Sequence, residues 1–147
     1  MKRSYPDRPI AAVGAIVVKD EHVLLIRRGK APSYGIWSVP GGAVHLGESL
    51  RDAVRREIRE ECGIEIDLTD LLEAVDRITR DAEGRTQYHY VVIDYLARWA
   101  SGDLTACSDC LEARWVAPAD LPQYQLTSGT AEVIRRMLAA GARAGVI

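Results

Sequence analysis

The sequence predicts an α+β domain in which helices pack on both faces of a mixed β-sheet. Its segments run strand, strand, strand, helix, several strands and helix, whereas an all-parallel sheet alternates strands and helices more strictly. The chain has 147 residues, and two separate cores in a chain this short would each be thin. We therefore expect residues 1–147 to form a single domain.

The first forty residues predict two paired strands and a short third one. Residues 10–18 are apolar and rich in β-branched side chains, and residues 23–26 repeat this composition after a polar turn. Two such runs are typical of a β-hairpin, and Gly14 within the first run suggests a β-bulge. After a loop rich in glycine and proline, we expect a short strand over residues 36–39, stopped by the Pro-Gly-Gly that begins at Pro40.

Residues 49–62 predict the first helix. Ser49 and Asp52 have the spacing of a capping box, and Gly63 stands where a left-handed residue ends a helix. The strands expected after this helix are 64–68, 71–78, 86–99 and 111–116.

A second helix is predicted near the end of the chain. It should cover roughly residues 129–140, opened by Thr127 and Ser128 and ended by Gly141. Helices at two separate points of the chain can cover the two faces of one sheet, which is why a layered arrangement is expected.

Composition and charge exclude several classes of function. Lys plus Arg is 19 and Asp plus Glu is 21, which gives a net charge of −2. Sequence-independent electrostatic binding of nucleic acid needs an excess of basic residues. No apolar run approaches the roughly 20 residues that span a bilayer, and the polar start lacks the apolar stretch of a signal peptide. We therefore expect no nucleic-acid partner, no membrane association and a cytoplasmic protein.

The three cysteines fit the same compartment. Three is an odd number, so no full disulfide framework is implied, and a reducing cytoplasm is the simplest setting. Cys107 and Cys110 have CxxC spacing, but there is no second pair to complete a zinc site. We expect reduced thiols in a solvent-exposed loop.

Three glutamates share one face of the first predicted helix. Because an α-helix turns about 100° per residue, Glu60 and Glu61 lie within about 60° of Glu57. The same side should point toward the body of the protein, since it carries the apolar side chains of Leu50, Ala53 and Val54.

This acidic cluster predicts a bound cation. Glu57 and Glu61 repel each other at i,i+4, and Arg56 alone cannot neutralise three carboxylates. Mg²⁺ prefers carboxylate and carbonyl oxygens, and Gly41 and Gly42 allow the close backbone approach that a carbonyl ligand needs. Zinc fits less well because it favours His and Cys. The alternative is a helix whose glutamates are solvated or paired with arginines.

Residues 42–64 match the pattern G-x5-E-x7-R-E-U-x-E-E-x-G-U, where U is aliphatic, at every fixed position. This pattern is the signature box of the Nudix hydrolases, and the chain resembles that family over nearly its whole length. The resemblance implies the Nudix fold, an α/β/α sandwich around a mixed sheet. It also implies hydrolysis of a nucleoside diphosphate that is linked to another group. The matching residues are Gly42, Glu48, Arg56, Glu57, Ile58, Glu60, Glu61, Gly63 and Ile64.

The resemblance also implies a set of metal ligands. Glu57, Glu60 and Glu61 would hold one or more Mg²⁺ or Mn²⁺ ions, with the carbonyl of Gly41 as a further ligand. Metal ions stabilise the charge on phosphate oxygens and lower the pKa of a bound water, which suits the implied reaction.

Other residues are expected to support this chemistry. Arg56 would orient the carboxylates through a salt bridge, and Glu48 would support the loop and helix. Many family members take a further glutamate from outside the box; Glu112 is the best match here and Asp109 the alternative. The proton of the attacking water is assigned to Glu61 or to Glu112.

The subgroup that the chain resembles in detail is the ADP-ribose pyrophosphatase-like one. ADP-ribose or a related nucleotide sugar is therefore the first expected substrate. Some ADP-ribose-cleaving relatives carry a proline shortly after the box, but this chain has none between Pro40 and Pro118. A (deoxy)nucleoside triphosphatase of the sanitising type is the alternative.

Three further expectations concern function, oligomeric state and the basic residues near the Pro-Gly-Gly segment. A catalytically silent nucleotide-sensing module is the rival from another functional class, but such modules usually lose box residues and this box is complete. Because many relatives are dimers, a homodimer is also expected.

Arg27, Arg28 and Lys30 precede the Pro-Gly-Gly segment and either contact phosphate or are solvated.

Overall fold

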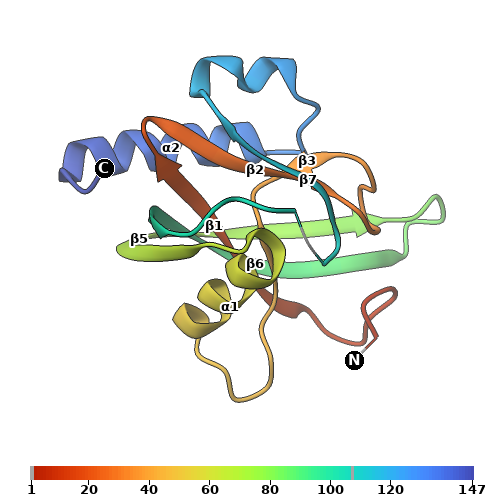
Figure 1. Ribbon diagram of the computed structural model, residues 1–147. Coiled ribbons are helices and arrows are strands. Elements are labelled where there is room, and N and C mark those ends of the chain that lie inside the picture. The colour runs from red at the N-terminus through yellow and green to blue at the C-terminus, as the bar shows by residue number, and fades with distance from the viewer. Residues whose placement is uncertain (1, 107) are drawn as a thin grey trace.

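The computed structural model describes residues 2–106 and 108–147 and shows a mixed β-sheet between two α-helices (Figure 1). Within those residues, seven strands form one sheet in the order β3-β2-β1-β6-β5, with β4 beside β1 and β7 beside β2. Strands β1 and β6 run parallel, and the other pairs are antiparallel. The elements are β1 (Ile10–Lys19), β2 (His22–Arg28), β3 (Trp37–Ser38), β4 (Gly41–Ala43), α1 (Leu50–Cys62), β5 (Glu65–Arg80), β6 (Thr86–Ser101), β7 (Cys110–Val116), a 3₁₀ helix (Pro118–Gln123) and α2 (Thr130–Ala144).

The sheet is buried on both faces, as its apolar strands predict. Successive side chains of a strand point to opposite faces, so Val13, Ala15 and Val17 of β1 pack with α1. Ile16 packs with α2 on the other face. In Figure 1, α1 lies below the sheet and α2 lies above it. The predicted mixed sheet with a helix on each face is therefore confirmed.

The β1–β2 hairpin is also confirmed. Asp20 and Glu21 form its two-residue turn with φ angles of 49° and 63°, and positive φ at both positions is the geometry that favours hairpin twist. The bulge expected at Gly14 is wrong, because β1 pairs with β6 in continuous register from Ile10 to Val18. Gly14 instead makes room for a side chain of β6, since a Cβ there would lie 2.3 Å from Asp94 Oδ1.

Helix α1 begins and ends where the sequence predicts. The Ser49 side chain caps it by accepting a hydrogen bond from the Asp52 N–H at 3.1 Å. Gly63 ends it in the left-handed conformation, with φ 69°, and donates its N–H to the carbonyl of Arg59 at 3.0 Å. These local signals fix the position of the acidic helix before any tertiary contact is considered.

Several other boundaries differ from the prediction. The segments 64–68 and 71–78 belong to one long strand, β5, whose register with β6 shifts between Leu68 and Leu72. Pro40 does not end the strand region, because Gly41–Ala43 continues as β4 and pairs with β1. These glycines extend the sheet because their small size lets β4 lie close to its neighbours.

Helix α2 also runs differently from the prediction. It starts after Gly129 and continues through Gly141 to a left-handed end at Gly145, with φ 72°. Gly141 is a packing residue, because a Cβ there would lie 2.4 Å from Leu96 Cδ2 on the sheet. Among the described residues, neither this helix nor α1 is long and apolar enough to cross a membrane.

Candidate active site

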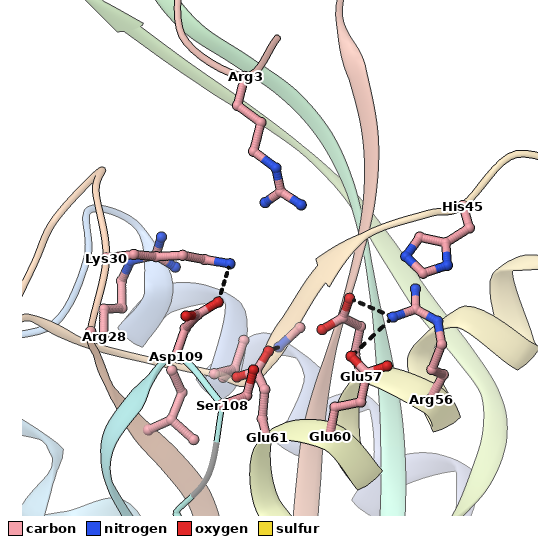
Figure 2. Close-up of a pocket in the computed structure, with 14 residues that line it drawn as sticks. Arg3, Arg28, Lys30, His45, Arg56, Glu57, Glu60, Glu61, Ser108 and Asp109 are labelled. Atoms are coloured by element: carbon pink, nitrogen blue, oxygen red, sulfur yellow. Dashed lines mark hydrogen bonds and ion pairs between the residues drawn. The ribbon is translucent and has the colours of Figure 1, made fainter. Parts of the chain in front are cut away.

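A cavity of about 170 Å³ lies where the C-terminal half of α1 meets β4, the loop after β2 and the start of β7. Figure 2 shows carboxylates from α1 on one side of it and basic side chains from the N-terminal segment and the β2 region on the other. We refer to it as the acidic cavity. Its charged lining consists of Arg3, Arg28, Lys30, Arg56, Glu57, Glu60, Glu61 and Asp109.

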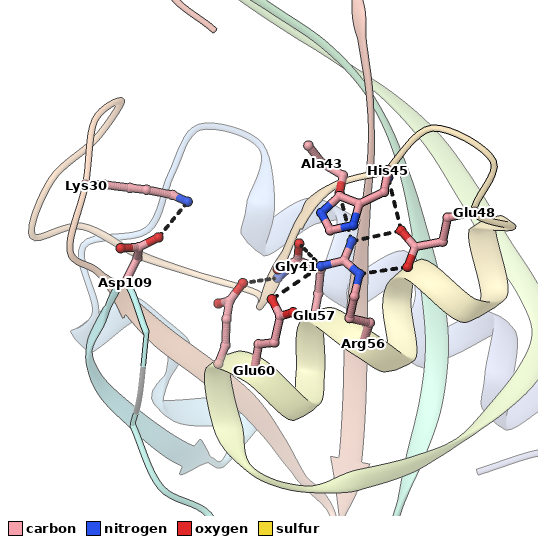
Figure 3. A network of polar contacts seen from close by, with 10 residues as sticks. Lys30, Gly41, Ala43, His45, Glu48, Arg56, Glu57, Glu60 and Asp109 are labelled. Atoms are coloured by element: carbon pink, nitrogen blue, oxygen red, sulfur yellow. Dashed lines mark hydrogen bonds and ion pairs between the residues drawn. The ribbon is translucent and has the colours of Figure 1, made fainter. Parts of the chain in front are cut away.

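Arg56 is the centre of a polar network that joins α1 to the loop before it (Figure 3). Its guanidinium donates two hydrogen bonds to Glu48, at 2.7 and 2.9 Å. It also contacts the carboxylates of Glu57 at 2.9 Å and Glu60 at 3.3 Å, and donates to the Ala43 carbonyl at 3.1 Å. One guanidinium therefore fixes two of the three clustered glutamates and ties them to β4.

Glu48 is held by this network rather than directed into the cavity. The Arg56 hydrogen bonds, followed by the backbone N–H of His45, lower the pKa of Glu48 to about 2. A carboxylate with two donors in a fork geometry is strongly oriented. Glu48 thus sets the position of Arg56, which in turn orients Glu57 and Glu60.

Glu61 is the most deeply buried of the clustered glutamates. Only 9% of its surface is exposed. Its carboxylate accepts hydrogen bonds from the Gly41 N–H at 3.3 Å and from the Cys110 thiol at 3.1 Å. Burial raises the pKa of Glu61 well above its usual range, and the charge of Glu57 adds to the shift, while the two hydrogen bonds oppose it. A nearby positive charge would therefore stabilise the ionised form.

The Pro-Gly-Gly segment packs directly against this cluster. A Cβ on Gly42 would lie 2.5 Å from the Glu57 carboxyl carbon, and one on Gly41 would lie 2.1 Å from the Val13 carbonyl oxygen. Gly41 therefore requires glycine, because the atoms that a Cβ would meet are backbone, whereas a Cβ on Gly42 would displace the Glu57 carboxylate. Gly41 faces Glu61 through its N–H, whereas the sequence-based account assigned its carbonyl to the metal.

The carboxylate oxygens of the acidic cavity suit a hard divalent cation, although they do not converge on a single position. Within residues 2–106 and 108–147, no three His, Cys, Asp or Glu side chains are arranged as a metal site. The reason is visible in the network, since Glu57 and Glu60 are turned onto Arg56. The carboxylates still line one cavity, and the buried Glu61 lacks a cationic partner among the contacts described above. Oxygen donors of this kind are those that Mg²⁺ and Mn²⁺ prefer.

The structure separates Glu112 from the other predicted site residues. Glu112 pairs with Arg27 at 3.4 Å and with Arg114 at 2.9 Å, and Arg114 lies over the ring of Trp37, on the α2 side of the sheet. The acidic cavity is on the α1 side. Asp109, the alternative, does line this cavity and forms an ion pair with Lys30 at 2.9 Å.

A shift of pairing in β7 explains this placement. Arg27 pairs with Glu112 but Arg28 pairs with Cys110, so the register changes between them. An extra residue in one strand exchanges the faces to which the following side chains point. Cys110 begins β7 and contacts Glu61, which corrects the expected solvent-loop position, whereas Cys107 lies outside the described residues.

A second, larger cleft of about 350 Å³ adjoins the acidic cavity. It lies on the α2 face of the sheet, and we refer to it as the sheet cleft. Its floor is formed by alternate residues of β1 and β6, and its walls by the start of α2 and by the segment around β3 and β4. The two hollows adjoin, because they share the lining residues Arg3, Arg28, Lys30, Val39 and Gly41.

The sequence-based account did not identify the polar residues of the sheet cleft. Asp94, Arg77 and Thr130 come from β6, β5 and the start of α2, and all three line it. One signal was available, because an aspartate in the otherwise apolar run of residues 91–96 is unusual in a buried strand.

A model of the NUDIX domain matches residues 8–137, which include the acidic cavity on α1 and the floor of the sheet cleft. The chain belongs to the Nudix family. It is therefore a Nudix pyrophosphohydrolase, an enzyme that acts on nucleotide diphosphate linkages.

Named relatives of this Nudix protein differ in substrate. It is 36% identical over 115 residues to the ADP-ribose pyrophosphatase of Methanocaldococcus jannaschii, a match that covers 78% of this chain and 66% of that protein, slightly under two thirds. It is 34% identical over 115 residues to the nucleoside triphosphatase NudI of Escherichia coli O81 (strain ED1a), covering 74% of this chain and 79% of that protein.

A solved structure confirms the Nudix fold. The crystal structure of a MutT NUDIX hydrolase from Burkholderia pseudomallei is 39% identical and superposes with a TM-score of 0.76. The match covers 88% of this chain and 98% of that chain.

Proposed function

We propose that this Nudix enzyme is Mg²⁺-dependent and cleaves the diphosphate linkage of ADP-ribose or a related nucleotide sugar. The observation that carries the proposal is Glu61, a buried carboxylate beside Glu57 in a cavity that adjoins a cleft of ligand size. A nucleotide sugar has a diphosphate between two bulky groups. The adjoining hollows would hold the diphosphate at the acidic cavity and one of these groups in the sheet cleft.

The chain's own residues account for the binding of such a linkage. Glu57 and Glu61 would hold the cation, with Glu60 as a further oxygen donor. A divalent cation, when bound, stabilises charge on phosphate oxygens and lowers the pKa of water. Arg28 and Lys30, on the opposite side of the cavity, would contact the non-bridging phosphate oxygens.

The arrangement favours Glu61 over Glu112 as the proton acceptor. Glu112 is engaged by two arginines on the other side of the sheet. Glu61 lines the acidic cavity itself, where the diphosphate is placed. Asp109 is held by Lys30, so it would position that lysine over the diphosphate.

A nucleoside triphosphate is the second candidate substrate. It is supported by the likeness to a protein named nucleoside triphosphatase NudI, and by the basic side chains that line the junction of the two hollows. A homodimer remains a prediction from the family resemblance.

Product analysis of purified protein with Mg²⁺ tests the proposal. ADP-ribose would give AMP and ribose 5-phosphate, whereas a nucleoside triphosphate would give the monophosphate and pyrophosphate. Turnover of ADP-ribose or a nucleotide sugar, abolished by EDTA and restored by Mg²⁺, is the expected result. Turnover of triphosphates alone would support the second candidate, and turnover of no nucleotide would support the silent sensing module.

A further inference from the structure

Asp94 is a buried carboxyl group on the floor of the sheet cleft. Only 3% of its surface is exposed, and it lies in the middle of β6. Its Oδ1 atom has no hydrogen-bond partner within the described residues. Buried polar groups nearly always have such a partner, so an orphaned carboxylate in a cleft indicates that a ligand completes its bonding.

The side chains around Asp94 do not supply the missing partner. Glu73 lies directly opposite on β5; its Oε1 accepts a hydrogen bond from Arg136 of α2 at 2.9 Å, and its Oε2 is also buried without a partner among the described residues. Arg77 donates to the Ser128 carbonyl and contacts Thr130 Oγ1 at 3.4 Å. Burial raises the pKa of Asp94 to about 6, with Arg77 lowering it and Glu73 raising it. At pH 8 the group is therefore an ionised acceptor.

The backbone of β1 leaves room for the Asp94 carboxylate. Gly14 pairs with Asp94 across the parallel β1–β6 ladder, and a Cβ on Gly14 would lie 2.3 Å from Oδ1. The adjacent floor positions carry the short side chains of Ala12 and Val92, whereas Tyr88 and Tyr90 line the cleft farther along β6. The part of the floor next to Asp94 is thus low and apolar, which suits a group with hydrogen-bond donors at its edge.

We propose that Asp94 is a specificity-determining residue that accepts hydrogen bonds from paired N–H or O–H donors at the nucleoside end of the substrate. The inference rests on the proposed function, because it takes the sheet cleft as the site of one end of the nucleotide. An ionised carboxylate only accepts hydrogen bonds. The donors that meet it in pairs are the N1–H and N2–H groups of a guanine edge and the cis hydroxyls of a ribose, whereas adenine offers a single amine.

The experiment changes the ligand one donor at a time. Each nucleotide that the wild-type enzyme cleaves is compared with its 2′-deoxy counterpart and with a counterpart that lacks the exocyclic amine, which is the inosine compound for guanosine and the purine riboside compound for adenosine. We expect wild-type kcat/KM to fall for one of the two analogues by roughly 10- to 100-fold, the range for a paired hydrogen bond to a base. The analogue that is rejected identifies the ribose or the base as the partner of Asp94.

The Asp94→Asn variant then tests the residue itself. It should cleave the parent nucleotide and the rejected analogue with kcat/KM values within about threefold of each other. Asp94→Ser provides a second variant if the first folds poorly. Asp67→Asn is the matched control, because it removes an exposed carboxylate from β5 and should keep the wild-type discrimination.

The outcomes separate this inference from the proposed function. Wild-type discrimination that persists in both Asp94 variants, or its absence in wild type, would overturn the role of Asp94. If no nucleotide is turned over, the proposed function fails, and calorimetric binding of AMP, GMP and IMP to wild type and Asp94→Asn still tests Asp94. Binding that distinguishes these ligands only in wild type supports the inference, and equal patterns in both proteins contradict it.

Discussion

The backbone N–H of Gly41 donates a hydrogen bond to the buried carboxylate of Glu61 at 3.3 Å. This contact joins β4 to α1 at the point where the acidic cavity adjoins the sheet cleft. The glycine segment therefore serves two purposes. It brings the backbone against the glutamates of α1, and it forms the shared wall of the two hollows.

Replacing Glu61 with glutamine should remove most of the activity and leave the fold intact. Loss of a metal ligand or base removes stabilisation of the transition state, and we expect kcat to fall by roughly 100- to 10,000-fold. Steady-state kinetics with Mg²⁺ and a circular dichroism melt measure the two effects. Glu132→Gln, an exposed glutamate of α2, is the control. Wild-type kcat in Glu61→Gln would contradict the assigned role.

Replacing Arg56 with lysine should weaken the site while keeping one positive charge. Lysine cannot reproduce the two parallel hydrogen bonds to Glu48 while also contacting Glu57 and Glu60. Residues that orient metal ligands typically contribute roughly 10- to 100-fold in metal affinity or activity. The concentration of Mg²⁺ that gives half-maximal activity should rise accordingly. An unchanged Mg²⁺ requirement would show that Arg56 does not position the carboxylates.

Adding one methyl group at Gly42 should disturb the cluster directly. The new Cβ would lie 2.5 Å from the Glu57 carboxyl carbon, so Gly42→Ala must displace the Glu57 carboxylate from its present position. We expect a loss of about 1–3 kcal/mol in the free energy of unfolding, as for other overpacked sites, together with lower activity. Urea denaturation and kinetics check both. The Ala43→Ser substitution at the next position should have a smaller effect on each.

Asp94 should make stability pH-dependent in a defined direction. Its pKa rises from an ordinary 3.8 to about 6 on folding, so the folded state binds the proton more tightly. The contribution of Asp94 protonation to the free energy of unfolding is fully present below pH 3.8 and is lost as pH rises through about 6. The free energy of unfolding of Asp94→Asn relative to wild type should therefore increase by about 2–3 kcal/mol from pH 4 to pH 8.

Urea denaturation at the two pH values measures this difference, with Asp67→Asn as the comparison. A difference that does not change with pH would mean that Asp94 titrates normally in the folded protein. A large destabilisation by Asp94→Asn at pH 8 would indicate a structural role for the carboxylate, because a buried group without a partner should not stabilise the fold.

The parts of the site that lie on α1 could be predicted from sequence because their signals are local. Ser49 and Gly63 fix the ends of the helix, and the spacing of Glu57 and Glu61 fixes their common face. None of these features depends on how distant strands pair.

The remainder depends on pairings that single-sequence patterns do not contain. The register shift in β7 turns Glu112 away from the cavity and brings Cys110 to Glu61. Asp94 becomes a floor residue only because β6 lies beside β1, at Gly14. Gly141 looks like a helix terminator, but it is retained within α2 because the helix packs closely on Leu96.

Calorimetric titration of Mg²⁺ into the purified protein, with Glu57→Gln and Glu61→Gln alongside wild type, measures whether the carboxylates of α1 hold the cation. Saturable binding by wild type, weakened at least tenfold in each variant and unchanged in Glu132→Gln, is the predicted result. Equal binding by wild type and both variants would contradict the claim that these carboxylates of α1 hold the cation.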